Sequence, residues 1–170
     1  SIPPHNLGEV CDATPHLIEN PESTVEDLMQ FVKAPDFPTG GLILGARGIH
    51  DAYTTGRGSI RMRAVAEIDE SKTGTPWIVV TEIPYQTSVE VIEEKAAAMV
   101  NNGKLEGIRK IRNESAKGKT RLVFELRRDA VPKVVLNNLF KYTPLQTTFS
   151  VNMVALDDGV PLTMNLLQVL

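Results

Sequence analysis

Apolar residues recur at helical spacing in several stretches of the chain, which predicts helices there. The first helix has Asn6 as a favourable N-cap, although Pro15 should bend or shorten it. The second begins with Ser23 and, three positions later, Glu26, the spacing of a capping box. Ser88 and Gly103 have the residue types that cap a helix at its two ends. The expected helices cover about residues 7–19, 25–32, 49–53, 89–102 and 130–142.

Apolar and polar residues alternate from Ile60 to Ile68, which predicts one half-buried strand. A turn around Gly74 should return the chain along a second strand, so that the two form an antiparallel hairpin. A second hairpin is expected further along, and a β-branched strand should end at a tight turn of Asp157, Asp158 and Gly159. The predicted strands cover residues 42–44, 60–68, 77–83, 108–113, 120–126 and 147–156. The fold class is therefore α+β, with antiparallel or mixed β hairpins and helices packed on one face.

Proline and glycine divide the chain into three expected parts. Residues 1–56 read as an N-terminal helical segment, 57–156 as an α+β domain, and 157–170 as the start of a further connection. The first residue is not methionine and the apolar C-terminal stretch stops abruptly, so the sequence reads as a fragment of a longer protein.

The composition is that of an ordinary globular chain, with 42% hydrophobic and 23% charged residues. The single cysteine, Cys11, cannot form an internal disulfide, which fits a reducing, cytoplasmic location. No apolar run approaches the ~18 residues of a membrane helix, and the N-terminus does not have the pattern of a signal peptide. We therefore expect no membrane association.

The charge is distributed unevenly along the chain. The net charge is −3, but residues 57–128 carry fourteen basic and ten acidic side chains, and within them 104–128 carry nine basic and three acidic ones. A local positive patch can hold a phosphate backbone even on a slightly acidic protein. The alternative is a solvated hairpin rich in lysine and arginine, which is the commoner meaning of a charge run.

Motif chemistry predicts no self-sufficient active site. The three histidines, His5, His16 and His50, lack partners at metal-ligand spacing, so no metal site is expected. Cys11 has no evident base, and no Gly-x-Ser-x-Gly or Walker motif is present. We therefore predict no catalytic residue and no cofactor.

Arginines on one predicted strand are the best candidates for phosphate contact. Arg57 lies between two glycines, where the backbone could approach a ligand closely, and Arg61 and Arg63 follow on the same face of the strand. Side chains two residues apart on a strand are about 6.6 Å apart and can bracket successive phosphates. A solvated outer face is the alternative. Only 5% of the residues are aromatic, which favours duplex backbone contact over base stacking. The full set of predicted DNA contacts is Arg57, Arg61, Arg63, Lys104, Arg109, Lys110 and Arg112.

Several segments, in order and spread over the whole chain, resemble the A subunits of bacterial DNA gyrase and topoisomerase IV, which are type IIA DNA topoisomerases. They are Ile2-Pro3-Pro4-His5-Asn6-Leu7, Ala34-Pro35-Asp36-Phe37-Pro38-Thr39, Asp51-Ala52-Tyr53, Thr55-Gly56-Arg57-Gly58, Thr81-Glu82-Ile83-Pro84-Tyr85-Gln86, Glu125-Leu126-Arg127-Arg128-Asp129-Ala130-Val131, Val135-Leu136-Asn137-Asn138-Leu139-Phe140 and Leu145-Gln146-Thr147-Thr148-Phe149, followed by Asn152-Met153 and Ala155-Leu156. The chain departs from the family pattern in places, notably at Thr87-Ser88-Val89 after Gln86, where the family usually continues Val-Asn-Lys and so has a polar-basic pair.

The resemblance implies a place in a larger enzyme that passes one DNA duplex through another, driven by ATP. It places this chain in the tower region of the breakage-reunion core, after a winged-helix domain and before a coiled coil. The tyrosine that attacks DNA would lie upstream of Ser1, and Tyr53, Tyr85 and Tyr142 fall in other motifs. The resemblance further implies double-stranded DNA as partner, an A-subunit homodimer in an A2B2 complex, and Mg²⁺ and ATP on the B subunit.

Two functions fit these expectations. In one, this piece binds and bends duplex DNA. In the other, it is a purely structural spacer between the catalytic head and the coiled coil, without DNA contact. A stand-alone enzyme acting on a small molecule is disfavoured because the sequence has no catalytic constellation.

Overall fold

The computed structural model describes residues 1–170 and has six helices and nine strands, which confirms the α+β class. The chain folds into two compact units, each made of more than one stretch of sequence. The first unit comprises Ser1–Pro38, Ile43–Arg61 and Thr148–Leu170, and the second comprises Thr39–Leu42 and Met62–Thr147. The division expected from the sequence, with boundaries at 56/57 and 156/157, stays a prediction.

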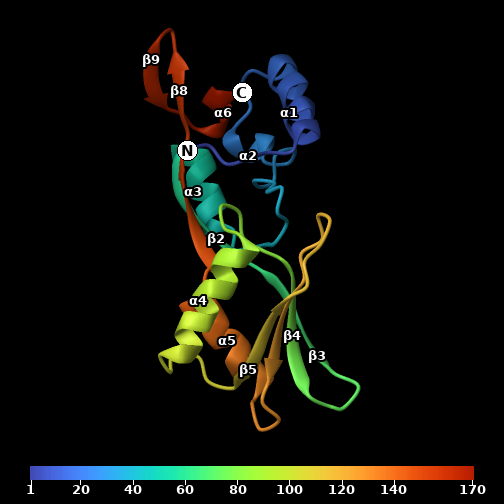
Figure 1. Cartoon of the computed structure of the whole chain (residues 1–170). Coiled ribbons are helices and arrows are strands. Elements are labelled where there is room, and N and C mark those ends of the chain that lie inside the picture. The colour runs from blue at the N-terminus through green and yellow to red at the C-terminus, as the bar shows by residue number, and fades with distance from the viewer. The chain divides into compact units, whose positions relative to one another are not determined.

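The second unit is a four-stranded antiparallel sheet with two helices. Its strands are β3 (Val65–Glu70), β4 (Pro76–Glu82), β5 (Ile108–Asn113) and β6 (Leu122–Leu126), in the order β3-β4-β6-β5. Helices α4 (Val89–Asn101) and α5 (Pro132–Tyr142) pack on the sheet (Figure 1). The side chains that meet in this core are fully buried or nearly so and include Ile78, Val80, Ile92, Leu122, Phe124, Leu126, Val135 and Leu139.

The first unit contains the remaining helices, most of a small sheet and a two-stranded ribbon. The helices are α1 (Leu7–Glu19), α2 (Val25–Leu28), α3 (Arg47–Thr55) and α6 (Leu166–Val169). Strands β1 (Leu42–Leu44), β2 (Arg57–Arg63) and β7 (Gln146–Asn152) form a three-stranded sheet in the order β1-β2-β7, and β8 (Val154–Asp157) pairs with β9 (Val160–Thr163). Tyr53, Ile60 and Leu28 are among its fully buried side chains.

Local signals determine the helix ends much as expected. The side chain of Asn6 accepts a hydrogen bond from the Glu9 amide, as an N-cap should, and α1 continues through Pro15 to Glu19. The Ser88 side chain likewise accepts from the Val91 amide, and Gly103 has a φ of 80° just beyond α4. Both predicted hairpins are present.

Two strands expected to be continuous are each divided. The predicted strand over 60–68 breaks at Ala64, so that β2 belongs to the three-stranded sheet and β3 to the four-stranded one. The Ala64 amide instead donates to the carbonyl oxygen of Leu145, at 2.8 Å. The predicted strand over 147–156 breaks at Met153, whose amide donates to the carbonyl oxygen of Gly56 at 2.8 Å. Alternation of apolar and polar residues indicates which side of a strand is buried. It does not indicate which neighbouring strand each half of the segment pairs with.

Two helix predictions also need correction. The capping box of α2 is formed by Thr24 and Asp27, because Ser23 is buried and its hydroxyl donates to the Asn20 carbonyl oxygen. Helix α2 ends after only four residues. In α5, Val135 and Leu139 face the core, whereas Val134 is 55% exposed.

Candidate nucleic-acid interface

Strand β2 presents basic side chains to solvent on one of its faces. Ile60 and Met62 are buried, whereas Arg57 and Arg61 are exposed. No carboxylate lies within ion-pair distance of either arginine. Because side chains alternate across a strand, the two arginines point to the same side and keep their full charge for a ligand.

The two glycines beside Arg57 were expected to let a ligand approach the backbone, but they are required by packing within the protein. A Cβ on Gly56 would lie 2.5 Å from the Met164 carbonyl oxygen, and one on Gly58 would lie 2.5 Å from the Gly48 carbonyl oxygen. Both glycines are therefore required by close packing within the protein itself. They do not mark a backbone surface open to a ligand, and the candidate contact at this place is the Arg57 side chain alone.

Arg63, at the end of β2, is held by its own fold. Its Nε and Nη2 donate to Oε1 of Gln146, at 3.0 and 2.6 Å. Its guanidinium also lies 4.3 Å from the ring centre of Phe140. No carboxylate neutralises the charge, but these contacts fix the side chain in a half-buried position. Arg63 is thus first a structural residue of the second unit.

The basic residues of β5 separate into exposed and paired ones. Arg109 lies where the register with β6 shifts, and both it and Lys110 are exposed without an ion pair. Lys104, just after α4, is exposed as well. Strand β5 is at an edge of the sheet, where lysine and arginine also protect against pairing with other chains. That protection is the structural alternative to a phosphate contact.

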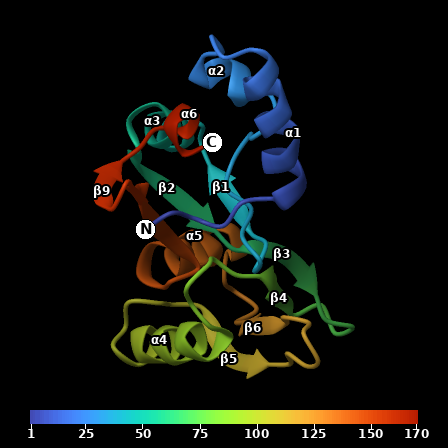
Figure 2. The same cartoon turned by 90° about the horizontal axis from the view of Figure 1, so that it is seen from above.

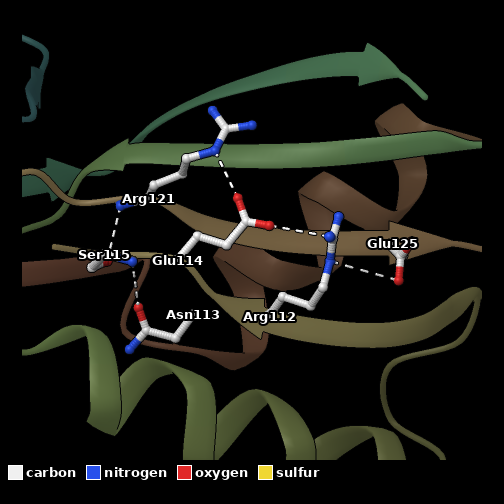
Figure 3. A network of polar contacts seen from close by, with 6 residues as sticks. All are labelled: Arg112, Asn113, Glu114, Ser115, Arg121 and Glu125. Atoms are coloured by element: carbon white, nitrogen blue, oxygen red, sulfur yellow. Dashed lines mark hydrogen bonds and ion pairs between the residues drawn. The ribbon is translucent and has the colours of Figure 1, made fainter. Parts of the chain in front are cut away.

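Arg112 has its charge matched by carboxylates. Its guanidinium lies 3.1 Å from a Glu114 oxygen and 3.7 Å from a Glu125 oxygen, and Glu114 also pairs with Arg121 at 2.9 Å (Figure 3). The guanidinium is 5.3 Å from the ring centre of Trp77. The predicted DNA contact at Arg112 therefore has little support from the structure, because a phosphate would have to compete with two carboxylates.

Several exposed basic residues of the second unit were not among the predicted contacts. Their only signal in the sequence was the net positive charge of residues 104–128, which does not single out individual side chains. They are exposed and have no ion pair: Lys117, Lys119, Arg127 and Arg128.

Comparison with known protein families identifies the family of this chain. The family model that describes the A subunit of DNA gyrase and topoisomerase IV matches residues 1–170, the entire chain. The chain belongs to this family. The resemblance seen in the sequence motifs is thereby confirmed.

Relatives within this gyrase and topoisomerase IV family are about half identical to the chain. The DNA gyrase A subunit of Streptococcus pneumoniae is 48% identical over 170 residues, which is 100% of this chain and 21% of the relative. The Synechocystis gyrase A subunit is 53% identical over 165 residues, covering 95% and 19%, and that of Mycolicibacterium smegmatis is 51% identical over 175 residues, covering 100% and 21%. The chain thus spans about a fifth of the length of these relatives.

The environment of Tyr53 does not suit a reactive tyrosine. Tyr53 is 1% exposed, and its hydroxyl lies 2.7 Å from Nε2 of His5. Burial raises the pKa of this hydroxyl well above its ordinary value, so it is held protonated and away from solvent. Both features are unsuited to a nucleophile that must reach a phosphodiester.

Neither a metal cluster nor a membrane-spanning helix is found in the chain. No group of three or more histidine, cysteine, aspartate or glutamate side chains is arranged to hold a metal ion. Every helix is too short or too polar to cross a bilayer.

Proposed function

We propose that this chain is the DNA-gripping section of the A subunit of a type IIA DNA topoisomerase, an enzyme that passes one duplex through a transient break in another. Family membership over all 170 residues supports the parent enzyme. The chain spans 21% of the S. pneumoniae relative, which leaves room for the cutting chemistry elsewhere in the polypeptide.

The observation that carries the proposal is the pair of exposed, unpaired arginines on β2. Arg57 and Arg61 extend from a strand that is held in a sheet, so their backbone positions are set before DNA arrives. The rigid strand removes the cost of ordering the backbone on binding, so that only the arginine side chains lose conformational freedom. Bending a site of 20–30 base pairs costs on the order of 1–6 kcal/mol, and lateral contacts of this kind offset that cost.

The second unit contributes its own set of cations. Lys104, Arg109 and Lys110 are exposed and free of carboxylates, as are the basic residues of the β5–β6 turn, Lys117 and Lys119. Contacts from these side chains would be to phosphate oxygens, and so would not depend on base sequence. We leave Arg112 and Arg63 out of the interface because their guanidinium groups already have partners.

The proposal assigns the chemistry to other parts of the enzyme. The nucleophilic tyrosine lies outside these residues, which fits the buried state of Tyr53. Mg²⁺ and ATP bind to a B subunit, and two A and two B subunits assemble in the cytoplasm. This section alone binds DNA without cutting it, and it needs no cofactor of its own.

Reversing the charge of the β2 arginines in the parent enzyme tests the proposal. Arg57→Glu together with Arg61→Glu should abolish supercoiling or relaxation, because the duplex is no longer held across the break. Lys33→Glu is the matched control: it makes the same kind of charge change at an exposed residue in the acidic segment 1–38. If the double variant keeps normal activity, the β2 arginines do not hold DNA, and the observation that carries the proposal is lost.

A further inference from the structure

Helix α1 has an uncharged stripe that faces solvent. Leu7 is 77% exposed and Ile18 is 72% exposed, the two highest values among the large hydrophobic side chains. They are separated by eleven residues, which is close to three helical turns, so they lie on the same side of α1. Cys11 and Pro15 lie between them on that side and are exposed as well. We call these four residues the α1 stripe.

The opposite side of α1 already has a partner within the chain. Ala13 is fully buried there, and the ring of His16 lies 4.9 Å from that of Phe31. Within the first unit, Figures 1 and 2 both show α2 near one end of the helix. The α1 stripe is therefore not needed for the helix to pack on its own unit, and exposed stripes of this kind mark interaction surfaces.

The charges beside the stripe narrow the choice of partner. Asp12 and Glu19 are exposed along its border, and residues 1–38 carry seven acidic side chains and one basic side chain. The negative electrostatic potential of this segment repels DNA phosphates. It also disfavours a second copy of the same stripe, since acidic borders would then face each other. It favours an element whose apolar side chains are bordered by lysine or arginine.

We propose that the α1 stripe docks against a segment of the same polypeptide outside these 170 residues, one that presents aliphatic side chains flanked by lysine or arginine. The relatives supply the room for such a segment, because this chain covers only 21% of the S. pneumoniae protein. The inference depends on family membership and not on DNA contact, so it is tested in the absence of DNA.

Cys11 provides a direct probe because it is the one cysteine of this chain and lies within the stripe. The full-length protein is treated with N-ethylmaleimide, and labelling of the peptide containing Cys11 is followed by mass spectrometry. Docking predicts labelling at least about tenfold slower than in the same protein unfolded in urea. Equal rates in the two states would overturn the proposal. So would protection that appears only when duplex DNA is added.

A charge variant tests the nature of the partner. Asp12→Lys together with Glu19→Lys should speed labelling of Cys11 severalfold, with each rate taken relative to that of the same variant unfolded in urea, because the docked segment is then repelled. Glu94→Lys, at an exposed position on α4, is the control and should leave the rate unchanged. Circular dichroism checks that each variant is folded. Protection that disappears when the protein is diluted to monomers would identify a second copy as the occupant, and would also overturn the proposal.

Discussion

Tyr53 and His5 form a partly buried hydrogen-bonded pair between residues 48 positions apart in the sequence, with 2.7 Å between the Tyr53 hydroxyl and Nε2 of His5. Nδ1 of His5 lies 2.8 Å from the Pro3 carbonyl oxygen, which can only accept. Nδ1 therefore carries the proton, and Nε2 accepts from the tyrosine. The pair joins the N-terminal segment to α3 and fixes one tautomer of the histidine.

This pair predicts that the chain loses stability in mild acid. Burial lowers the pKa of His5 below its ordinary value of 6.5, so the folded chain binds this proton less readily than the unfolded chain does. The contribution of His5 to the free energy of unfolding is fully present above that value and is lost as the pH falls below it. Urea titrations at about pH 8 and about pH 5 should show the loss, and His5→Gln should reduce it. The same pH dependence in both proteins would contradict the prediction.

Removal of the Arg61 side chain and removal of the Arg63 side chain should change the stability of the fold by different amounts, although both residues were predicted DNA contacts. Arg63→Ala loses the bonds to Gln146 and the contact with Phe140, which should cost about 1–3 kcal/mol of stability. Arg61→Ala removes an exposed, unpaired side chain and should change stability by no more than about 0.5 kcal/mol. Chemical denaturation of the two variants measures the difference. Equal destabilisation would mean that Arg61 has structural contacts of its own.

Arg112 and its neighbours on β5 give a second contrast. Arg112→Met should weaken DNA binding less than loss of an exposed, unpaired cation does, because Glu114 and Glu125 already occupy its guanidinium. Arg109→Ala with Lys110→Ala should weaken binding of any duplex sequence, since the contacts go to phosphates. Fluorescence polarisation with two unrelated duplexes distinguishes the cases. A large loss for Arg112→Met alone, with the fold intact, would place that residue back in the interface.

Most element types were predictable from the sequence because their signals are local. Asn6, Ser88 and Gly103 determine helix ends through contacts with residues three or four positions away. The division at Ala64 was missed because it depends on Leu145, far along the chain. A shift of one residue in the capping box, from Ser23 to Thr24, was missed because Ser23 is drawn into a turn with Asn20.

The candidate interface was predictable to the same extent. Alternation from Ile60 onward was enough to place Arg61 on the exposed face of a strand, and the structure extends that strand back to Arg57. No local pattern indicates that Arg63 meets Gln146, which lies 83 positions later, or that Arg112 meets Glu125 across the sheet. Charge in a sequence identifies possible cations, and only tertiary contacts determine which of them are free to bind.

The salt dependence of DNA binding tests the central claim most directly. Removing one phosphate-binding side chain should make the slope of log K against log salt concentration shallower by about 0.9. Arg57→Ala with Arg61→Ala, introduced into the full-length protein, should therefore reduce the slope by about 1.8, equally for unrelated duplexes. If slope and affinity both stay at the wild-type values, the β2 arginines do not touch the DNA backbone.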